Sequence, residues 1–465
     1  MITEIDIKNF KSIQKDEIHL EPLTVVVGAN STGKSNLIKA LDFISDIVEY
    51  GVNDAVYQRG GFSEILPKNL KTLTGLETYF KINIEIEPPT NWPSEYGKLK
   101  AVYELGIEQN QRGKIKIKRE SLEIKSILLL SFFLDKKWQS KENKDKIDKE
   151  LTTLDSMQNS NIIIKRQKTN KLSFETNIEF NAENYNLLIN WLGLKGFFES
   201  KKELKPNINE LNKLLASLLN AVRPGKSNED LPILSLDRVF FGISSQLRKM
   251  IAELDSISRY DLFINELRQE QIISNSRRVS ISGDNIPSVV KHFVKEEKDS
   301  WRRISTTMSN ISPYFSKVYS ESLRAGKEYL VFEEIFKGRP IESWEASDGT
   351  LRALAILLCL ESHKEGSTVL IEEPEHGLHP WAVKDLIEHM KETINLKNIQ
   401  VILTTHSQQV LECINQNELL ITERDEQGTR YYTVSSIVPE SSNISMGEIG
   451  ELWTRGLLKG VPTSF

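Results

Sequence analysis

The segment GANSTGKS at residues 28–35 constrains the fold of this chain more than any other feature. It fits the spacing G-x-x-x-x-G-K-[ST], in which glycines let backbone N–H groups curl around phosphates at the start of a helix. The apolar run LTVVVG precedes it, and apolar residues at helical spacing follow from Lys34. The continuous valine run predicts a strand buried on both faces, as in a parallel sheet. This context predicts a phosphate-binding loop between a strand and a helix.

Two residues of this loop have defined chemistry. Lys34 can reach the β- and γ-phosphates of a nucleotide, and the Ser35 hydroxyl can bind Mg²⁺. We therefore expect ATP and Mg²⁺ as cofactors. The other candidate nucleotide contacts in the loop are Gly28, Asn30, Ser31, Thr32, Gly33 and Asn36.

Two carboxylates follow a later apolar strand in STVLIEEPEHGLHP. A carboxylate at the C-terminal end of a parallel strand faces the ligand crevice. We expect Glu372 to orient Mg²⁺ or its water, and Glu373 to activate the attacking water. A surface acidic turn is the alternative interpretation.

Two further segments carry candidate phosphate contacts. The segment IQVILTTHSQQVLE places His406 after another apolar strand, where it can hydrogen-bond a γ-phosphate oxygen or be an ordinary packed histidine. In SDGTLRALAILLCLES, Ser347 and Gly349 precede a strongly apolar helix. This arrangement suits an anion and equally suits a helix N-cap, and the two interpretations are compatible.

Taken in order, these motifs resemble the ABC ATPase superfamily, in particular stand-alone ATPases of the OLD, RecF and SMC type. The segments IKNFKSI and LTVVVGANSTGKSNLIKAL resemble its first strands and Walker A motif. SDGTLRALAI is similar to the signature motif, LIEEPEHGLHP to Walker B, and TTHS to the switch histidine. The resemblance places Lys11 and Ser12 near the nucleotide and makes Gln58, in VYQRGG, a candidate glutamine-loop metal ligand. Glu372 departs from many relatives, which carry Asp there.

The expected fold class is α/β, an ABC-type ATPase head with a mixed sheet around the phosphate loop and an antiparallel β-subdomain. We expect an N-terminal lobe over 1–125, a mainly helical insertion over 126–285 and a C-terminal lobe over 286–465. Alternating lysine-rich strands from residue 78 to about 124 predict the antiparallel sheet. Within the insertion, NIIIKRQKTNKLSFE predicts a hairpin, and apolar spacing predicts a helix over 244–270.

The resemblance also implies partners. In ABC ATPases the Walker A motif of one head faces the signature motif of another, so a homodimer or a higher oligomer is expected. No Toprim-like acidic cluster follows His406, and only about 50 residues follow Leu411, too few for a nuclease domain. We therefore expect a separately encoded nuclease or Toprim-type effector, with a phage-derived trigger or DNA as a further partner. Anti-phage ATPase subunits of the PARIS and Septu types are similar.

Three other interpretations stay open. A DNA-repair or chromosome-maintenance ATPase could use the basic segments 136–146, 165–171 and 199–205 to grip DNA, although such charge runs are usually solvated faces. The net charge of −5 argues against binding nucleic acid by bulk electrostatics. A scaffold with structural ATP and a transporter motor are the others.

Composition predicts a cytoplasmic protein. The two cysteines, Cys359 and Cys413, lie in apolar surroundings and provide no disulfide framework. The N-terminus has no signal-peptide core, and no apolar run approaches the roughly 20 residues of a membrane helix.

Overall fold

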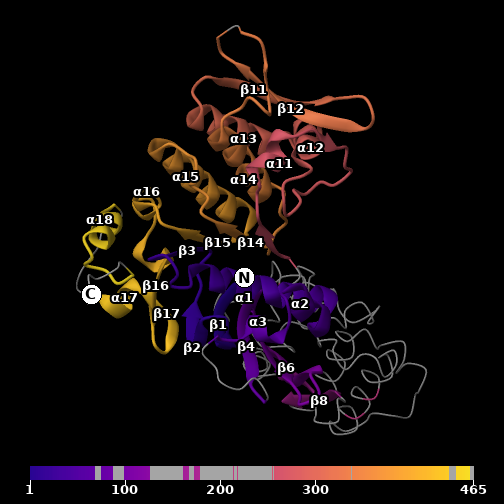
Figure 1. Ribbon diagram of the computed structural model, residues 1–465, viewed down its shortest axis with the longest axis vertical. Coiled ribbons are helices and arrows are strands. Elements are labelled where there is room, and N and C mark those ends of the chain that lie inside the picture. The colour runs from indigo at the N-terminus through magenta and orange to yellow at the C-terminus, as the bar shows by residue number, and fades with distance from the viewer. Residues whose placement is uncertain are drawn as a thin grey trace, which may run out of the picture. The chain divides into compact units, whose positions relative to one another are not determined.

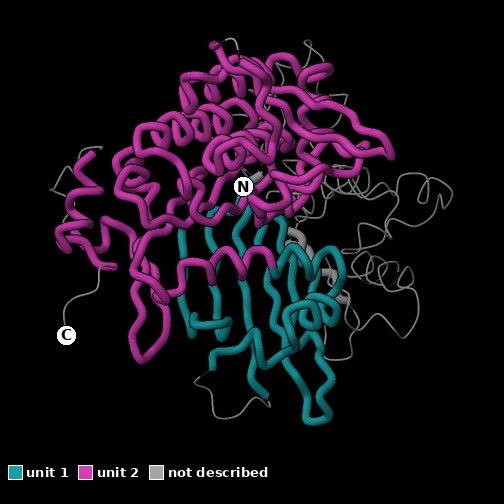
Figure 2. The backbone as a smooth tube through the Cα atoms, turned by 45° about the horizontal axis from the view of Figure 1, so that its top comes forward, with its two compact units in different colours: residues 1–19, 43–255 teal, residues 20–42, 256–465 magenta. Residues whose placement is uncertain are grey.

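The computed structural model describes residues 1–68, 75–86, 99–125, 161–166, 172–177, 256–336, 338–438 and 447–460, with Lys213, Ser217 and Leu254. The chain divides into two compact units (Figure 2). Unit 1 consists of Met1–His19 and Phe43–Asp255, and unit 2 of Leu20–Asp42 and Ser256–Phe465. This division cuts across the predicted lobe 1–125, because its first and third strands fall in different units. Most of the predicted insertion, 126–285, lies outside the described residues.

Unit 1 contains a seven-stranded sheet in the order β2-β1-β4-β5-β6-β7-β8. Every neighbouring pair is antiparallel, as the alternating sequence predicts. In β6, Ile115 and Ile117 are buried while the neighbouring Lys116 and Lys118 are exposed. The predicted hairpin is confirmed as β7 and β8. The strands are β1 (Ile2–Phe10), β2 (Ile13–His19), β4 (Glu77–Ile86), β5 (Leu99–Gln109), β6 (Ile115–Lys125), β7 (Asn161–Arg166) and β8 (Leu172–Asn177), and the short helices are α2 (Val52–Gln58) and α3 (Phe62–Ile65).

Unit 2 contains a six-stranded sheet in the order β17-β16-β3-β15-β14-β9. All neighbours are parallel except β16 and β17. A smaller antiparallel sheet has the order β10-β12-β11, with β13 beside β12. The strands are β3 (Leu23–Gly28), β9 (Ile257–Tyr260), β10 (Gln271–Ile272), β11 (Phe315–Ser322), β12 (Lys327–Glu334), β13 (Ile341–Glu342), β14 (Thr368–Glu372), β15 (Gln400–Thr405), β16 (Leu419–Asp425) and β17 (Gly428–Thr433).

Four long helices of unit 2 gather on one side of strands β14 and β15 (Figure 1). They are α12 (Ile286–Glu296), α13 (Lys298–Ile311), α14 (Asp348–Glu361) and α15 (Pro380–Lys397). The shorter helices are α11 (Ile264–Arg268), α16 (Gln408–Leu411), η4 (Gln416–Glu418), α17 (Val434–Ile437) and α18 (Glu448–Thr454). Helix α1 (Lys34–Tyr50) belongs to unit 2 as far as Asp42.

The core of unit 2 explains the most apolar stretches of the sequence. Strands β3 and β15 are buried along their whole length, as their valine and isoleucine content predicts. Helix α14 is buried on nearly all sides, because α13 and α15 both pack against it. A helix that is hydrophobic all round must lie inside the protein. The mixed α/β fold predicted from the sequence is confirmed.

Of the helix predicted over 244–270, Leu254 is helical, but the prediction is wrong over residues 257–260. Residues 257–260 form strand β9, which pairs in parallel with β14, and a five-residue helix, α11, follows. Ile257 and Tyr260 are both buried, a spacing that places them on one face of a helix or on the two covered faces of a buried strand. Tertiary pairing with β14 therefore decided the conformation. None of the described helices combines the length and the apolar character that crossing a bilayer requires.

Candidate nucleotide site

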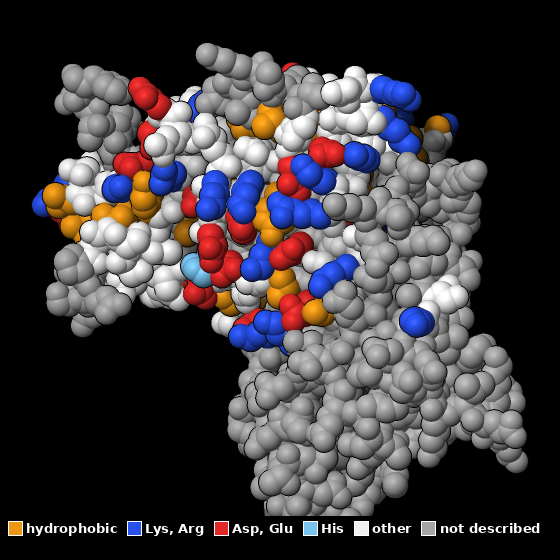
Figure 3. Space-filling view, turned by 90° about the horizontal axis from the view of Figure 1, so that it is seen from below, with side chains coloured by type: hydrophobic (Ala, Val, Ile, Leu, Met, Phe, Trp, Pro, Cys, Tyr) orange, Lys and Arg blue, Asp and Glu red, His pale blue; other side chains and the backbone are white. Residues whose placement is uncertain are grey.

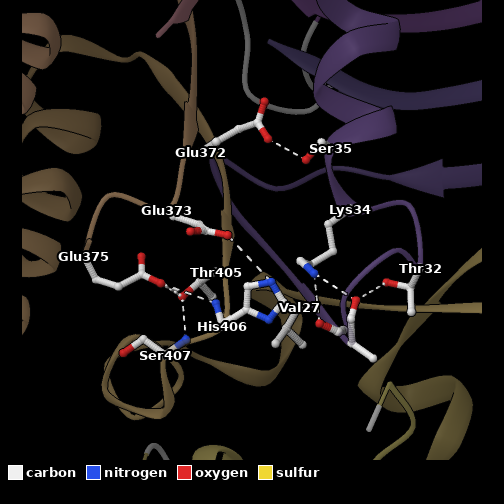
Figure 4. Close-up of polar contacts among 12 residues, drawn as sticks. Val27, Thr32, Lys34, Ser35, Glu372, Glu373, Glu375, Thr405, His406 and Ser407 are labelled. Carbon is white, nitrogen blue, oxygen red and sulfur yellow. Dashed lines mark hydrogen bonds and ion pairs between the residues drawn. The ribbon is translucent and has the colours of Figure 1, made fainter. Parts of the chain in front are cut away.

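The candidate site of unit 2 lies where three parallel strands end. Val27 is in register with Thr405, and Glu372 with Thr404. Because the C-terminal ends of parallel strands meet at one edge, the phosphate loop, the acidic pair and the histidine come together although the chain separates them widely. Figure 4 shows Lys34, Ser35, Glu372, Glu373 and His406 converging on this edge.

The Lys34 side chain binds the backbone of its own phosphate loop. Its ammonium donates to the carbonyl oxygens of Gly28 and Ala29, each at 3.0 Å. Burial lowers the pKa of Lys34 from its ordinary value, and Glu373 and Glu372 oppose that shift. The loop backbone needs positive φ at Gly33 (110°) and at Ser31 (65°). The lysine side chain is thus folded over the loop, where a phosphate would compete for its hydrogen bonds.

Strands β16 and β17 support the loop from residues that sequence reasoning missed. The Thr32 and Thr422 hydroxyls lie 2.7 Å apart, and the Thr429 hydroxyl donates to the Thr32 carbonyl at 2.6 Å. The Tyr431 hydroxyl donates to the Gly33 carbonyl at 2.9 Å. No local signal could have found these residues, because they follow the loop by nearly four hundred positions.

The residues predicted to bind the metal ion are adjacent. The Ser35 hydroxyl donates to a Glu372 carboxylate oxygen, and the other carboxylate oxygen lies 3.2 Å from the Arg259 guanidinium. A hydroxyl and a carboxylate in contact are oxygen ligands of the kind Mg²⁺ prefers. The residues therefore fit the expected ion, although glutamate replaces the aspartate of many relatives. Arg259, on β9, was not foreseen, because its strand was predicted as helix.

Glu373 and His406 face each other. The His406 Nε2 lies 3.6 Å from a Glu373 carboxylate oxygen, and both side chains are partly exposed (Figure 4). Burial lowers the pKa of His406 from its ordinary value, and the charge of Lys34 acts in the same direction. The imidazole is therefore neutral at neutral pH, with one nitrogen able to donate and the other to accept.

The serine-glycine turn begins helix α14. Ser347 is the N-cap, because its hydroxyl accepts from the Thr350 N–H at 3.1 Å, as the N-cap interpretation predicts. Gly349 lies against the loop after β14, since a Cβ there would stand 2.4 Å from the Gly377 carbonyl oxygen. The adjacent Asp348 side chain is held by Arg268 at 2.5 Å.

The remaining predicted site residues lie in the phosphate loop, in the first turn of α1 or in unit 1. Asn30 is exposed, and Asn36 donates its N–H to the Gly33 carbonyl in the first turn of α1. Lys11, Ser12 and Gln58 belong to unit 1. The Lys11 ammonium donates to the Glu64 carbonyl oxygen at 2.6 Å, and Gln58 is exposed at the end of α2. Their roles stay predictions.

The basic segments proposed for DNA binding lie mostly outside the described residues. Of segment 165–171, Arg166 is described and buried, with Glu120 accepting two of its hydrogen bonds at 2.8 and 3.0 Å. It is therefore part of the sheet of unit 1 rather than of a solvated basic face. On the face in Figure 3, the described basic and acidic side chains are interspersed rather than separated.

A phosphate loop, an acidic strand end and a histidine on a parallel α/β core define a P-loop ATPase of the AAA and ABC type. The family model described as "AAA domain, putative AbiEii toxin, Type IV TA system" matches residues 23–412, which is most of the chain. The chain belongs to this family. The predicted ATPase class is confirmed, whereas no curated protein matches the sequence.

Solved structures with similar chain paths include SMC heads. One is the SMC head domain from Thermotoga maritima, 11% identical, covering 93% of this chain and 98% of that chain, with a TM-score of 0.39. A second is the Smc head domain with a coiled coil and joint from Pyrococcus yayanosii, 14% identical, covering 98% and 99%, with a TM-score of 0.43. A third is an SMC head bound to the C-winged helix domain of ScpA, 13% identical, covering 94% and 99%, also at 0.43.

Proposed function

We propose that unit 2 binds ATP with Mg²⁺ and hydrolyses it, with Glu373 as the general base. The observation that carries this proposal is the convergence of Lys34, Ser35, Glu372 and the Glu373–His406 pair at one edge of the parallel sheet. A base must lie within reach of the attacking water, and the partly exposed Glu373 carboxylate is accessible to one.

Each side chain has a distinct task in this scheme. Lys34 exchanges its bonds to the loop carbonyls for bonds to the β- and γ-phosphates. Ser35 and Glu372 hold Mg²⁺, which neutralises charge on the phosphate oxygens when bound. Neutral His406 has a single ring N–H, which it donates to a γ-phosphate oxygen.

The functional unit is a homodimer. The N-terminus of α14 presents Ser347 and the Gly349 N–H, and a helix N-terminus favours a phosphate. In the family resemblance this turn closes on the ATP of a second copy, which yields two shared sites. The γ-phosphate then stabilises the closed dimer, and hydrolysis releases it by removing the contacts that favour the closed state.

The variant Glu373→Gln tests this proposal. It retains Lys34 and Ser35, so we expect ATP binding within about threefold of wild type. Loss of a general base costs about 10²–10⁴-fold in turnover. The variant should accumulate as an ATP-bound dimer, measured by mass with and without ATP. Turnover close to that of wild type would refute the assignment of Glu373 as the general base. A variant that stays monomeric in saturating ATP would refute the proposed homodimer.

We further propose that this cycle gates a separately encoded nuclease or Toprim-type effector in anti-phage defence. Support comes from the resemblance of its motifs to those of stand-alone defence ATPases. Affinity purification from the native operon tests this part alone. An effector at stoichiometric ratio is expected, and recovery of the ATPase by itself, with or without ATP, would count against it.

A further inference from the structure

Arg352, on helix α14, is partly buried beside the loop that carries Glu373. One Nη atom of its guanidinium donates to the carbonyl oxygens of Glu372 and Glu373, each at 3.1 Å. Its Nε is buried and has no hydrogen-bond partner among the described residues, which also offer it no ion pair. A buried N–H with an unmet hydrogen bond costs free energy, so the position of this guanidinium points to a task at this loop.

The task concerns the backbone of Glu373. This residue has a φ of 47°, a left-handed conformation that is unfavourable for a residue with a Cβ and persists only where its surroundings enforce it. Its N–H donates to the Thr404 carbonyl at 2.9 Å, and its carbonyl accepts from Arg352 and from the His376 N–H. Arg352 is thus the side chain that secures the carbonyl end of this strained residue, and it thereby sets the direction of the Glu373 carboxylate.

Glu375, in the loop that carries Glu373, holds the backbone of His406. One of its carboxylate oxygens accepts from the Thr405 hydroxyl at 2.5 Å and from the His406 N–H at 3.3 Å. Its other oxygen is buried without a hydrogen-bond partner among the described residues. Burial lowers the pKa of Arg352 and raises that of Glu375, whereas the charge of Glu375 favours the ionised guanidinium. Arg352 therefore holds the backbone of Glu373, and Glu375 holds the backbone of His406.

Helix α14 connects this arrangement to the serine-glycine turn. Gly349 and Arg352 are three residues apart and lie on one face of the helix. Gly349 approaches the Gly377 carbonyl so closely that no Cβ would fit, while Arg352 binds the carbonyls at the start of the same loop. The turn and the loop that carries Glu373 are therefore in contact at two points of the same helix.

We propose that Arg352 is a positioning residue that couples the Ser347–Gly349 turn to the Glu373–His406 pair, with Glu375 holding the histidine side. This inference rests on the proposed roles of Glu373 and His406. In a dimer, the Ser347–Gly349 turn that binds the partner's ATP would also position Glu373 at the chain's own site. The two sites would then hydrolyse ATP in a coupled manner.

Replacement of Arg352 tests the coupling. In Arg352→Met, ATP affinity should stay within about threefold, because the phosphate loop is untouched, whereas turnover should fall about 100-fold through misplacement of the base. Arg352→Lys keeps a positive charge and a hydrogen-bond donor but loses the planar guanidinium. Its turnover should lie between those of wild type and Arg352→Met. The control is Arg302→Met, an exposed arginine on α13. Equal turnover in all four proteins would overturn the proposal.

Hydrogen exchange without nucleotide provides a readout independent of turnover. In Arg352→Met the amides of residues 373–377 and 405–407 should exchange at least about tenfold faster, while those of β3 keep their protection. Unchanged exchange in both loops would overturn the proposal even if turnover fell. If Arg352→Met does not fold, Arg352→Lys carries both measurements. A wild-type protein without ATPase activity would instead refute the proposed function, and the exchange data would still decide this inference.

Discussion

At the scale of single residues, the functional groups of the site bind one another or the loop backbone. Lys34 caps loop carbonyls, Ser35 donates to Glu372, and Arg259 neutralises the carboxylate that would face the metal ion. Each of these contacts uses a group that would bind ATP or Mg²⁺ in the proposed function. Binding therefore exchanges internal polar contacts for ligand contacts, and the site stays satisfied in both states.

Lys34→Ala tests the first of these exchanges. The lysine supplies charge-assisted hydrogen bonds to phosphate, so its loss should weaken ATP binding by about 10- to 100-fold. Labelled ATP measures the affinity directly. Lys39→Ala, on the same helix α1 and outside the loop, is the matched control and should bind as wild type does. Unchanged affinity in Lys34→Ala would refute the assignment of the loop.

At the scale of elements, the end of β3 and the strand β16 pack without room for an extra atom. Gly28 is in register with Thr422, and a Cβ at Gly28 would stand 2.2 Å from the Thr422 hydroxyl oxygen and 2.6 Å from its carbonyl oxygen. The glycine is required here by close approach. The first glycine of the phosphate loop thus serves the sheet as well as the nucleotide.

Gly28→Ala should therefore be costly in two ways. Overpacking costs about 1–3 kcal/mol of unfolding free energy, and displacement of β16 withdraws Thr422 from the loop. We expect a lower thermal midpoint together with weaker ATP binding. The control is Gly338→Ala. Gly338 is exposed, and a Cβ added there would stand 3.8 Å from the nearest heavy atom. A variant with the stability of wild type would show that β3 and β16 can separate freely.

At the scale of the whole molecule, buried histidines make unit 2 sensitive to acid. Burial lowers the pKa of His363 to about 3 and that of His389 to about 4. His363 meets the Tyr260 hydroxyl at 2.7 Å, and His389 meets the Thr307 hydroxyl at 2.9 Å. Both imidazoles are therefore neutral in the folded protein and gain a proton on unfolding below pH 6.5.

This difference predicts the direction of the pH dependence. Between pH 6.5 and the histidine pKa values of the folded protein, the unfolded chain binds more protons than the folded chain does. The unfolding free energy therefore falls as the pH falls. From pH 7 to pH 5 each histidine should contribute a loss of about 2 kcal/mol. Urea unfolding followed by tryptophan fluorescence measures it. His389→Gln should flatten the dependence and His376→Gln, at an exposed position, should not; equal slopes would contradict the prediction.

The sequence by itself determined the parts of the molecule whose physics is local. The loop 28–35, the buried strand before it and the apolar helix α14 follow from spacing, conformational preference and hydrophobicity over short stretches. The order of the motifs was enough to predict the α/β core and the ATPase class. The alternation of β4, β5 and β6 likewise predicted their antiparallel sheet.

Only the tertiary structure decided which distant residues complete the site. Tyr431 supports the loop from β17, Arg259 reaches Glu372 from a strand that apolar spacing predicted as helix, and Arg352 binds the backbone of Glu373. None of these residues belongs to a motif with a local signature. Their positions depend on strand order and helix packing, because a hydrogen bond is decided by distance in space and not by separation along the chain.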